Sequence, residues 1–135
     1  MKRVMVLLVF VSALPSSVLA QDAGAITGDP TAGQRDFAIC MACHQIGPNA
    51  KIAVGPVLNG VVGRKVASYP GFDYSDALKN SGIKEWTVPE LEKWLAGPMK
   101  LVPGTKMIFP GFTDPKQVND VIAYLAQYND KGEKK

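Results

Sequence analysis

The sequence predicts an all-α fold: one small domain with three main helices, one or two short ones, and long loops between them. Helix-start signals, in which a capping side chain is followed by proline, precede apolar residues at helical spacing in three places. Glycine and proline interrupt two long intervening segments, and no stretch shows a convincing strand pattern. A chain of 135 residues also has the length of a single domain.

The N-terminal segment has the features of a secretory signal peptide. Residues 1–20 begin with Lys2 and Arg3, continue as an uncharged apolar run, and end in small residues that suit cleavage after Ala20. An uncleaved membrane anchor is the alternative, but the apolar core is shorter than the ~20 residues of a membrane span. We therefore expect residues 21–135 to be the exported domain, with the periplasm as its destination.

Composition and charge narrow the class of protein. The chain is 47% hydrophobic and 20% charged, which is ordinary for a globular protein. Without the signal peptide it has 13 basic and 12 acidic side chains, and this balance argues against a nucleic-acid-binding protein. A domain of about 115 residues buries only a modest core, and small domains often depend on a metal or cofactor.

The first helix is expected to begin at Asp29–Pro30, because aspartate caps helices and proline is tolerated at the first helical position. Phe37 and the segment Cys40–His44 follow at helical spacing, which places the cysteines at the end of this helix. The preceding residues 21–28 have the composition of a flexible lead-in.

A long loop follows the first helix. Gln45 to Tyr74 carry no clear helix or strand pattern and contain repeated glycine and proline breaks. So long a loop in a small domain indicates that the chain wraps a bulky ligand. Ser75 is then expected to cap a short helix that runs through Lys79 and ends near Gly82.

Two further helices are predicted. Thr87–Glu90 has the pattern of a capping box and opens a helix that stops at Gly97–Pro98. Residues 98–112 then form a second loop with three prolines and two glycines. Asp114–Pro115 starts the last helix, and the charged tail after it is expected to fray. Its apolar positions fit one face: Val118, Val121, Ile122, Leu125 and Tyr128.

The pentapeptide CMACH contains the only two cysteines and the only histidine of the chain. A redox-active disulfide between Cys40 and Cys43 would belong near a βαβ pattern, which is not visible. A structural zinc site takes four ligands from cysteine and histidine, and only three are present. Covalent haem attachment uses all three residues, because two sulfurs on one helical turn can bond two vinyl groups while His44 binds the iron. We favour one haem c, held by two thioethers.

Haem iron with one histidine ligand has a further position, and methionine there gives an electron-transfer centre. An open position would instead allow gas binding or peroxide chemistry. Met41 lies between the cysteines and cannot reach the opposite face. Met99 and Met107 remain, and both could simply fill the core. The turn before Met107 can present its thioether at a defined angle, so local chemistry favours Met107 over Met99.

Several segments resemble, in the same order, class I c-type cytochromes, close to bacterial cytochrome c2 and mitochondrial cytochrome c. VPGTKMIFPGF at 102–112 resembles the methionine-ligand loop of that family, and GDPTAGQRDFAICMACH at 28–44 resembles its first helix. VGPVLNGVVGRK at 54–65 and VNDVIAYLAQY at 118–128 resemble its glycine-rich segment and its C-terminal helix. The likeness covers residues 28–128 and implies a small single-haem cytochrome c fold.

The resemblance also implies roles for individual residues. Met107 would be the distal axial ligand, and the carbonyl of Pro56 would accept a hydrogen bond from the second ring nitrogen of His44. Gly33 would let the first helix cross the last one. Three residues would lie near the haem propionates: Arg64, Tyr74 and Trp86. Phe37 would pack at the crossing of the first and last helices, and Tyr124 would take the aromatic packing position of the last one. Trp94 stands where the family often has a tyrosine near the methionine sulfur.

These inferences predict a periplasmic, monomeric electron carrier with one His/Met-ligated haem, and not an enzyme. The expected partners are redox proteins: a bc-type complex, a terminal oxidase, a photosynthetic reaction centre or a dehydrogenase. No nucleic acid and no small-molecule substrate is expected. Lys51, Lys100 and Lys106 lie in loops expected near the haem edge, where they either steer docking or are simply solvated.

Overall fold

The computed structural model describes residues 24–135, so the predicted signal peptide lies outside the described residues. This part of the chain has no strand and only two isolated bridges, Lys65–Glu85 and Tyr128–Lys134. None of its helices is long and apolar enough to cross a membrane. The helices, in chain order, are α1 (Pro30–Asp36), η1 (Phe37–Ala42), α2 (Asp76–Lys79), α3 (Val88–Ala96), α4 (Pro98–Leu101) and α5 (Pro115–Ala126). The all-α prediction is therefore confirmed.

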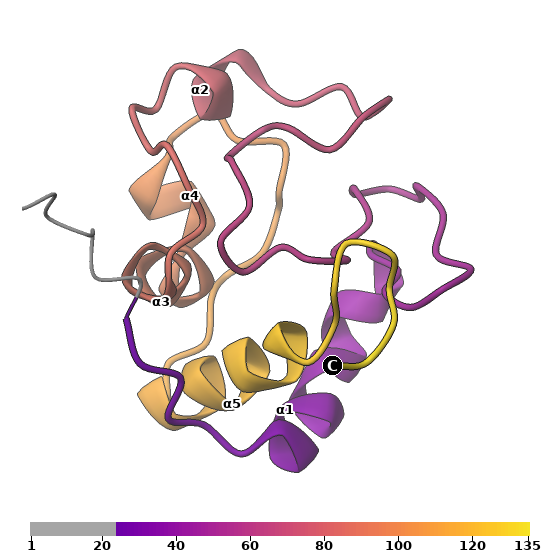
Figure 1. Ribbon diagram of the computed structural model, residues 1–135. Helices are drawn as coiled ribbons and strands as arrows, with labels where there is room; N and C mark the ends of the chain where they lie inside the picture. The colour runs from indigo at the N-terminus through magenta and orange to yellow at the C-terminus, as the bar shows by residue number, and fades with distance from the viewer. Residues whose placement is uncertain (1–23) are drawn as a thin grey trace, which may run out of the picture.

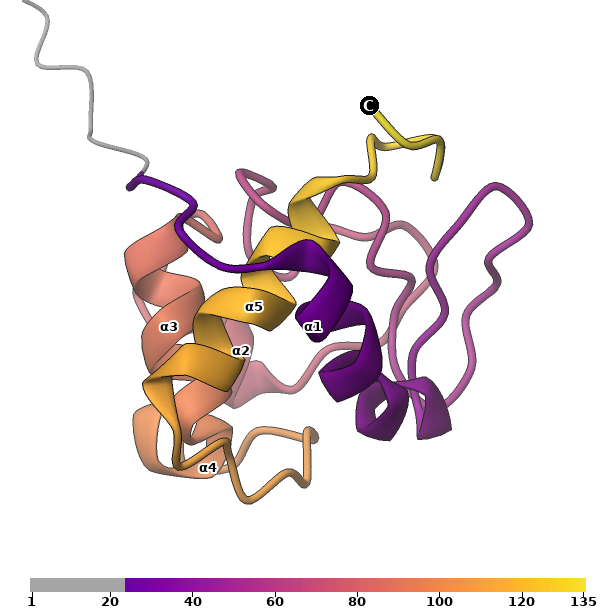
Figure 2. The same cartoon turned by 90° about the horizontal axis from the view of Figure 1, so that it is seen from below.

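The first and last helices cross near the two ends of the described chain (Figures 1 and 2). At the crossing, a Cβ added to Gly33 would overlap the backbone carbonyl of Asp120. One turn further along the chain, the ring of Phe37 lies against the ring of Tyr124, with centroids 5.1 Å apart. Glycine at this position therefore sets how closely the two helices approach.

A buried carboxylate fastens this crossing. Asp120 lies on α5 and is only 3% exposed. It accepts the backbone N–H of Asp29 at 2.8 Å, and its second oxygen accepts from Lys116 Nζ at 2.6 Å. The start of α1 is thus bound to the middle of α5 by a charged acceptor, which makes a stronger hydrogen bond than a neutral one.

Helix α3 packs on the side of α5 away from α1, and the three helices share one hydrophobic core (Figure 1). The predicted apolar face of α5 is buried at Val118, Val121, Ile122 and Leu125. Tyr128 lies beyond the helix end and is half-buried.

The helix starts follow the predicted caps. Asp29 accepts from the backbone N–H of Thr31 at 2.8 Å, and Asp114 accepts from that of Lys116 at the same distance. Ser75 and Thr87 cap α2 and α3 in the same manner. The capping box is only half present, because the Glu90 carboxylate accepts from Lys93 at 2.8 Å.

Two element boundaries differ from the sequence prediction. Helix α1 ends at Asp36, and the chain tightens into the 3-10 helix η1, so Cys40 lies in a 3-10 turn. Such turns are common at the ends of α-helices. The predicted loop after Gly97 contains the short helix α4. Pro98 ends α3 and also begins α4, because proline is well suited to the first position of a helix.

Both ends of the described chain are better ordered than predicted. Gly24 lies against Val88 and Pro89 at the start of α3, and Gly28 lies against α5, where an added Cβ would overlap the backbone of Asn119. The charged tail folds back as a hairpin: Asn129 N–H donates to the carbonyl of Glu133 at 2.9 Å, and Lys135 N–H donates to that of Gln127 at 2.8 Å. Composition alone predicted fraying because it cannot show these backbone bonds.

Candidate functional site

A cavity of about 410 Å³ occupies the middle of the domain, and its lining runs from Phe37 to Leu125. This volume lies within the range of natural ligand pockets. Residues from η1, the long loops, α3 and α5 all contribute to the wall. The lining is mostly apolar, so the cavity suits a large apolar group with few polar contacts.

The CMACH motif forms one wall of this cavity. Cys40 and Cys43 are half-buried free thiols, and both line the cavity together with His44. Burial, together with the charge of neighbouring Cys43, raises the pKa of the Cys40 thiol to about 11. The backbone turn is closed by the N–H groups of Cys43 and His44, which both donate to the carbonyl of Cys40.

The ring of His44 is held in one orientation. Its Nδ1 lies 2.7 Å from the carbonyl oxygen of Pro56. Because a carbonyl only accepts hydrogen bonds, Nδ1 carries the proton and Nε2 carries the lone pair that binds a metal. Burial lowers the pKa of His44, which favours this neutral ring. Gly55 lies flat against the imidazole, where an added Cβ would lie 2.5 Å from Cε1.

The structure separates the candidate methionines. Met107 is half-buried and lines the cavity, while its backbone N–H donates to the hydroxyl of Thr105 at 3.3 Å. Met99 is 42% exposed on α4 and does not belong to the cavity lining. Met41 is 67% exposed and is also outside that lining. Of these three methionines, Met107 alone therefore shares the cavity with His44.

Arg64 also lines the cavity. Its Nη1 donates to the carbonyls of Val57 at 3.2 Å and Asn59 at 2.9 Å, and its guanidinium lies over the ring of Tyr69. Burial lowers the pKa of Arg64. Its Nε is buried with no hydrogen-bond partner within residues 24–135. An unpaired donor beside an apolar cavity suits a carboxylate such as a haem propionate.

The two predicted aromatic residues lie on the same lining. Tyr74 is buried, its hydroxyl accepts from the backbone N–H of Tyr69 at 3.2 Å, and burial raises its pKa. Accepting this bond leaves the hydroxyl proton available for donation. Trp86 is buried against Trp94 with ring centroids 5.1 Å apart, and both residues line the cavity.

Taken together, these residues fit a haem. Two thiols lie beside a histidine with a free Nε2, a thioether shares the cavity, and Arg64 offers an unpaired donor. Within residues 24–135, no three side chains of histidine, cysteine, aspartate or glutamate are grouped so that they could hold a metal ion by themselves.

Comparison with known proteins agrees with this chemistry, although no protein-family model matches the chain. The chain is 54% identical over 99 residues to cytochrome c2 of Rhodomicrobium vannielii, which covers 73% of this chain and 78% of that protein. It is 48% identical over 116 residues to cytochrome c2 of Blastochloris viridis, covering 86% and 91%. The chain belongs to the cytochrome c2 family.

Solved structures support the same assignment. Cytochrome cH from Methylobacterium extorquens is 52% identical, with a TM-score of 0.69 over 74% of this chain and 99% of that one. Cytochrome c2 from Rhodospirillum centenum is 36% identical, with a TM-score of 0.68 over 76% and 99%. The predicted small cytochrome c fold is confirmed.

Family membership decides between the interpretations of CMACH. Cytochromes c2 carry covalently attached haem c and transfer electrons, so this chain is a single-haem electron carrier and not an enzyme. The disulfide and zinc interpretations of Cys40 and Cys43 are wrong for this chain. Two residues that shape the site, Gly55 and Asn59, were assigned no role from the sequence, although both lie in the glycine-rich segment 54–65.

Proposed function

We propose that this chain is a periplasmic carrier of single electrons whose haem iron is bound by His44 and Met107. The observation that supports this ligand pair most directly is the shared cavity, which contains Met107 but not Met99. Ligation by histidine and methionine would raise the reduction potential of the iron, and it would leave no open position for gas binding. Haem supplies the one-electron chemistry, and the residues of the chain supply ligands, orientation and a dry site.

The surrounding residues have distinct tasks in this proposal. Cys40 and Cys43 form the thioethers, and Pro56 fixes the tautomer of His44 through its carbonyl. Arg64, Tyr74 and Trp86 line the same cavity and would border the haem. Arg64 and Tyr74 would donate hydrogen bonds to the haem propionates. Pairing the buried Nε of Arg64 with a carboxylate would offset the desolvation penalty of both groups.

Electrons are proposed to pass at the mouth of the cavity. Ile39 and Ile108 line the cavity and are 59% and 80% exposed, so an apolar rim surrounds the opening. Lys106 also lines it, but its Nζ pairs with Asp73 at 2.6 Å, which weakens its use as a free positive charge. Lys51 and Lys100 are exposed but lie outside the cavity lining, so any steering of a docking partner by their charges would act from outside the rim.

The partners in this proposal are membrane-bound redox complexes met by a monomeric carrier. A bc-type complex or a dehydrogenase would donate the electron, and a terminal oxidase or a photosynthetic reaction centre would accept it. Export requires that residues 1–20 act as a signal peptide and that residues 21–135 form the mature domain. N-terminal sequencing of the protein from a periplasmic fraction tests this, and a chain that retains Met1 would contradict cleavage.

The ligand pair is tested by the optical spectrum of the ferric holoprotein. A weak long-wavelength band is typical of methionine sulfur bound to ferric iron, and we expect this band in the wild type. Met107→Ala should abolish it, whereas the matched variant Met99→Ala should keep it. A wild-type spectrum without the band, or one that only Met99→Ala alters, would overturn the assignment of Met107.

A further inference from the structure

We propose that Asn59 and the C-terminal turn, residues 129–133, are positioning elements for His44. They act by closing the far end of the loop that carries Pro56, so that its carbonyl stays within hydrogen-bond distance of the imidazole. This inference rests on the proposed role of His44 as an iron ligand.

The two sides of the loop between His44 and Asn59 are joined by a short series of hydrogen bonds, which we call the ladder, and each bond is one rung. Gly55 N–H donates to the carbonyl of Cys43 at 2.8 Å, and Leu58 N–H donates to that of Gln45 at 3.0 Å. The bond from His44 to Pro56 lies between these two rungs. The position of the Pro56 carbonyl therefore depends on the register of the whole ladder.

Asn59 makes the last rung with its side chain. Its Oδ1 accepts the N–H of Gly47 at 2.8 Å, and its Nδ2 donates to the carbonyl of the same residue at 2.9 Å. Asn59 is only 7% exposed, so both bonds are shielded from water. A side chain that both donates and accepts is required here, and alanine supplies neither function.

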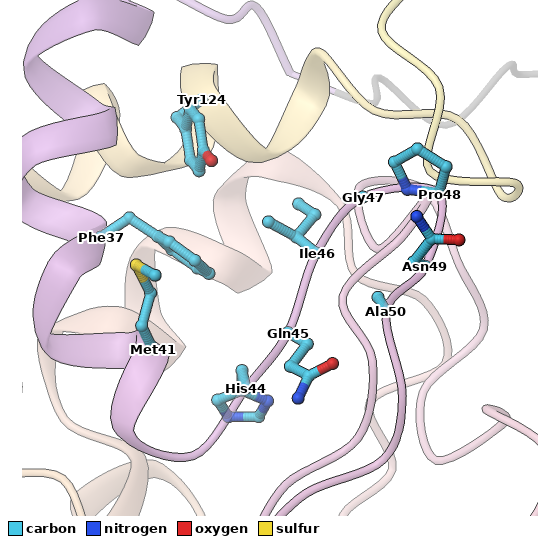
Figure 3. Close-up of a pocket in the computed structure, with 10 residues that line it drawn as sticks. All are labelled: Phe37, Met41, His44, Gln45, Ile46, Gly47, Pro48, Asn49, Ala50 and Tyr124. Atoms are coloured by element: carbon cyan, nitrogen blue, oxygen red, sulfur yellow. The ribbon is translucent and has the colours of Figure 1, made fainter.

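Packing alone does not hold this segment. A second cavity of about 590 Å³ lies between residues 44–50, Met41 and Tyr124 (Figure 3). Figure 3 shows the chain passing from His44 through Gln45 and Ile46 along this open side. Ile46 packs against the hydrophobic core, but the segment borders open space on this side, so the hydrogen bonds at its closed end add a restraint that packing does not supply.

The C-terminal turn covers that closed end. A Cβ added to Gly132 would overlap the carbonyl of Gly47 and lie 2.5 Å from Nδ2 of Asn59. The folded tail and this loop lie side by side in both ribbon views (Figures 1 and 2). Asn129 shapes the turn, since its Oδ1 accepts from the backbone N–H groups of Lys131 and Glu133, each at 2.9 Å. The tail thus presses on the Asn59–Gly47 rung from outside.

Weakening the Asn59–Gly47 bonds should affect the haem iron through the hydrogen bond between His44 and Pro56. The bond from Nδ1 of a metal-ligating histidine to a carbonyl makes the ring a more basic ligand. A more basic ligand stabilises ferric iron, so weakening the bond to Pro56 should raise the reduction potential. It should also let the Nδ1 proton of His44 exchange with solvent more readily.

The test uses the holoprotein with Asn59→Ala and Gly132→Ala. Asn80→Ala is the control for the first, because Asn80 is exposed at the end of α2. Gly82→Ala is the control for the second, because Gly82 has nearly the same φ, +84° against +80°, but open space where its Cβ would lie. Circular dichroism confirms that each variant is folded.

NMR of the reduced holoprotein measures exchange of the His44 Nδ1 proton, and voltammetry measures the potential. Losing a hydrogen bond of ordinary strength should speed exchange by about tenfold in Asn59→Ala. A smaller acceleration is expected in Gly132→Ala, with a raised potential in both variants and no change in the two controls. Folded Asn59→Ala with wild-type exchange and potential would overturn the inference.

The wild-type spectrum separately tests the proposed ligand on which the inference depends. Ring protons of a haem-bound His44 are displaced strongly by the ring current of the porphyrin. If the wild type shows them at ordinary positions, the proposed function fails. If they are displaced in every variant while exchange and potential do not change, only the positioning inference fails.

Discussion

Gly33→Ala tests whether the crossing of α1 and α5 depends on backbone contact. Helix propensity alone predicts that this change stabilises α1 by about 1 kcal/mol, because alanine is the better helix former. The structure predicts the opposite, since the new Cβ would overlap the carbonyl of Asp120, which is backbone and cannot rotate away. The sign of the effect therefore distinguishes the two explanations.

The size of the stability loss can be estimated from the contacts that the helix crossing buries. Parting the helices by about 1 Å would forfeit up to roughly half of the contact energy at Phe37, whose burial contributes about 1.5–3 kcal/mol. Strain from overpacking adds about 1–3 kcal/mol, and the propensity gain offsets about 1 kcal/mol. We expect a net loss of about 1–3 kcal/mol in the free energy of unfolding.

The assay is urea denaturation of the ferric holoprotein, followed by far-ultraviolet circular dichroism. Gln34→Ala is the matched control, because Gln34 is exposed at the next position of α1 and should change stability by less than about 0.5 kcal/mol. If Gly33→Ala proved as stable as the wild type or more stable, the close approach of the two backbones would not be what requires glycine.

Three further changes have clear expected outcomes. Asp120→Asn should lower the free energy of unfolding at neutral pH. Because the hydrogen bond from Lys116 lowers the pKa of Asp120 below its usual 3.8, the stability difference between variant and wild type should persist above about pH 4 and vanish as pH falls below it. Urea denaturation across the acid range measures this, and a pH-independent difference would contradict it. Thr87→Ala should cost about 1 kcal/mol in the same assay, since the N–H of Glu90 loses its acceptor; unchanged stability would show that the cap contributes nothing. Asp73→Asn removes the negative charge that pairs with Lys106 at the cavity rim, while the bond from Lys106 to the backbone carbonyl of residue 73 stays. Reduction of ferricyanide should therefore become faster and more salt-dependent than in the control Glu92→Gln, whose side chain is exposed and outside the cavity lining; equal salt responses would refute local steering.

Local signals predicted much of the fold. The caps at Asp29, Ser75, Thr87 and Asp114 lie within a few residues of the helices they start, so a single sequence shows them. The CMACH motif is equally local, which is why five consecutive residues are enough to indicate haem attachment. The folded C-terminal tail and helix α4 were not predicted, because contacts between distant parts of the chain determine them.

The site was predictable only in part. Local chemistry favoured Met107 over Met99 but could not exclude Met99, because the difference lies in which thioether the folded loop brings to the cavity. Asn59 was assigned no role from the sequence, because its partner Gly47 lies 12 residues away in a segment without periodicity. A hydrogen bond across an irregular loop leaves no repeating pattern that a single sequence can reveal.

The bond between Asp29 and Asp120 joins residues that are 91 positions apart, so most of the chain lies between the two helices that cross. Bringing such distant helices together is the entropic barrier in forming this topology. The entropic cost of closing such a loop grows only with the logarithm of the loop length. Doubling the length would add about 0.6 kcal/mol to this cost. Extra residues inserted at Gly82, which is exposed and has open space around it, should therefore change stability little, so this topology is tolerant of variation in loop length there.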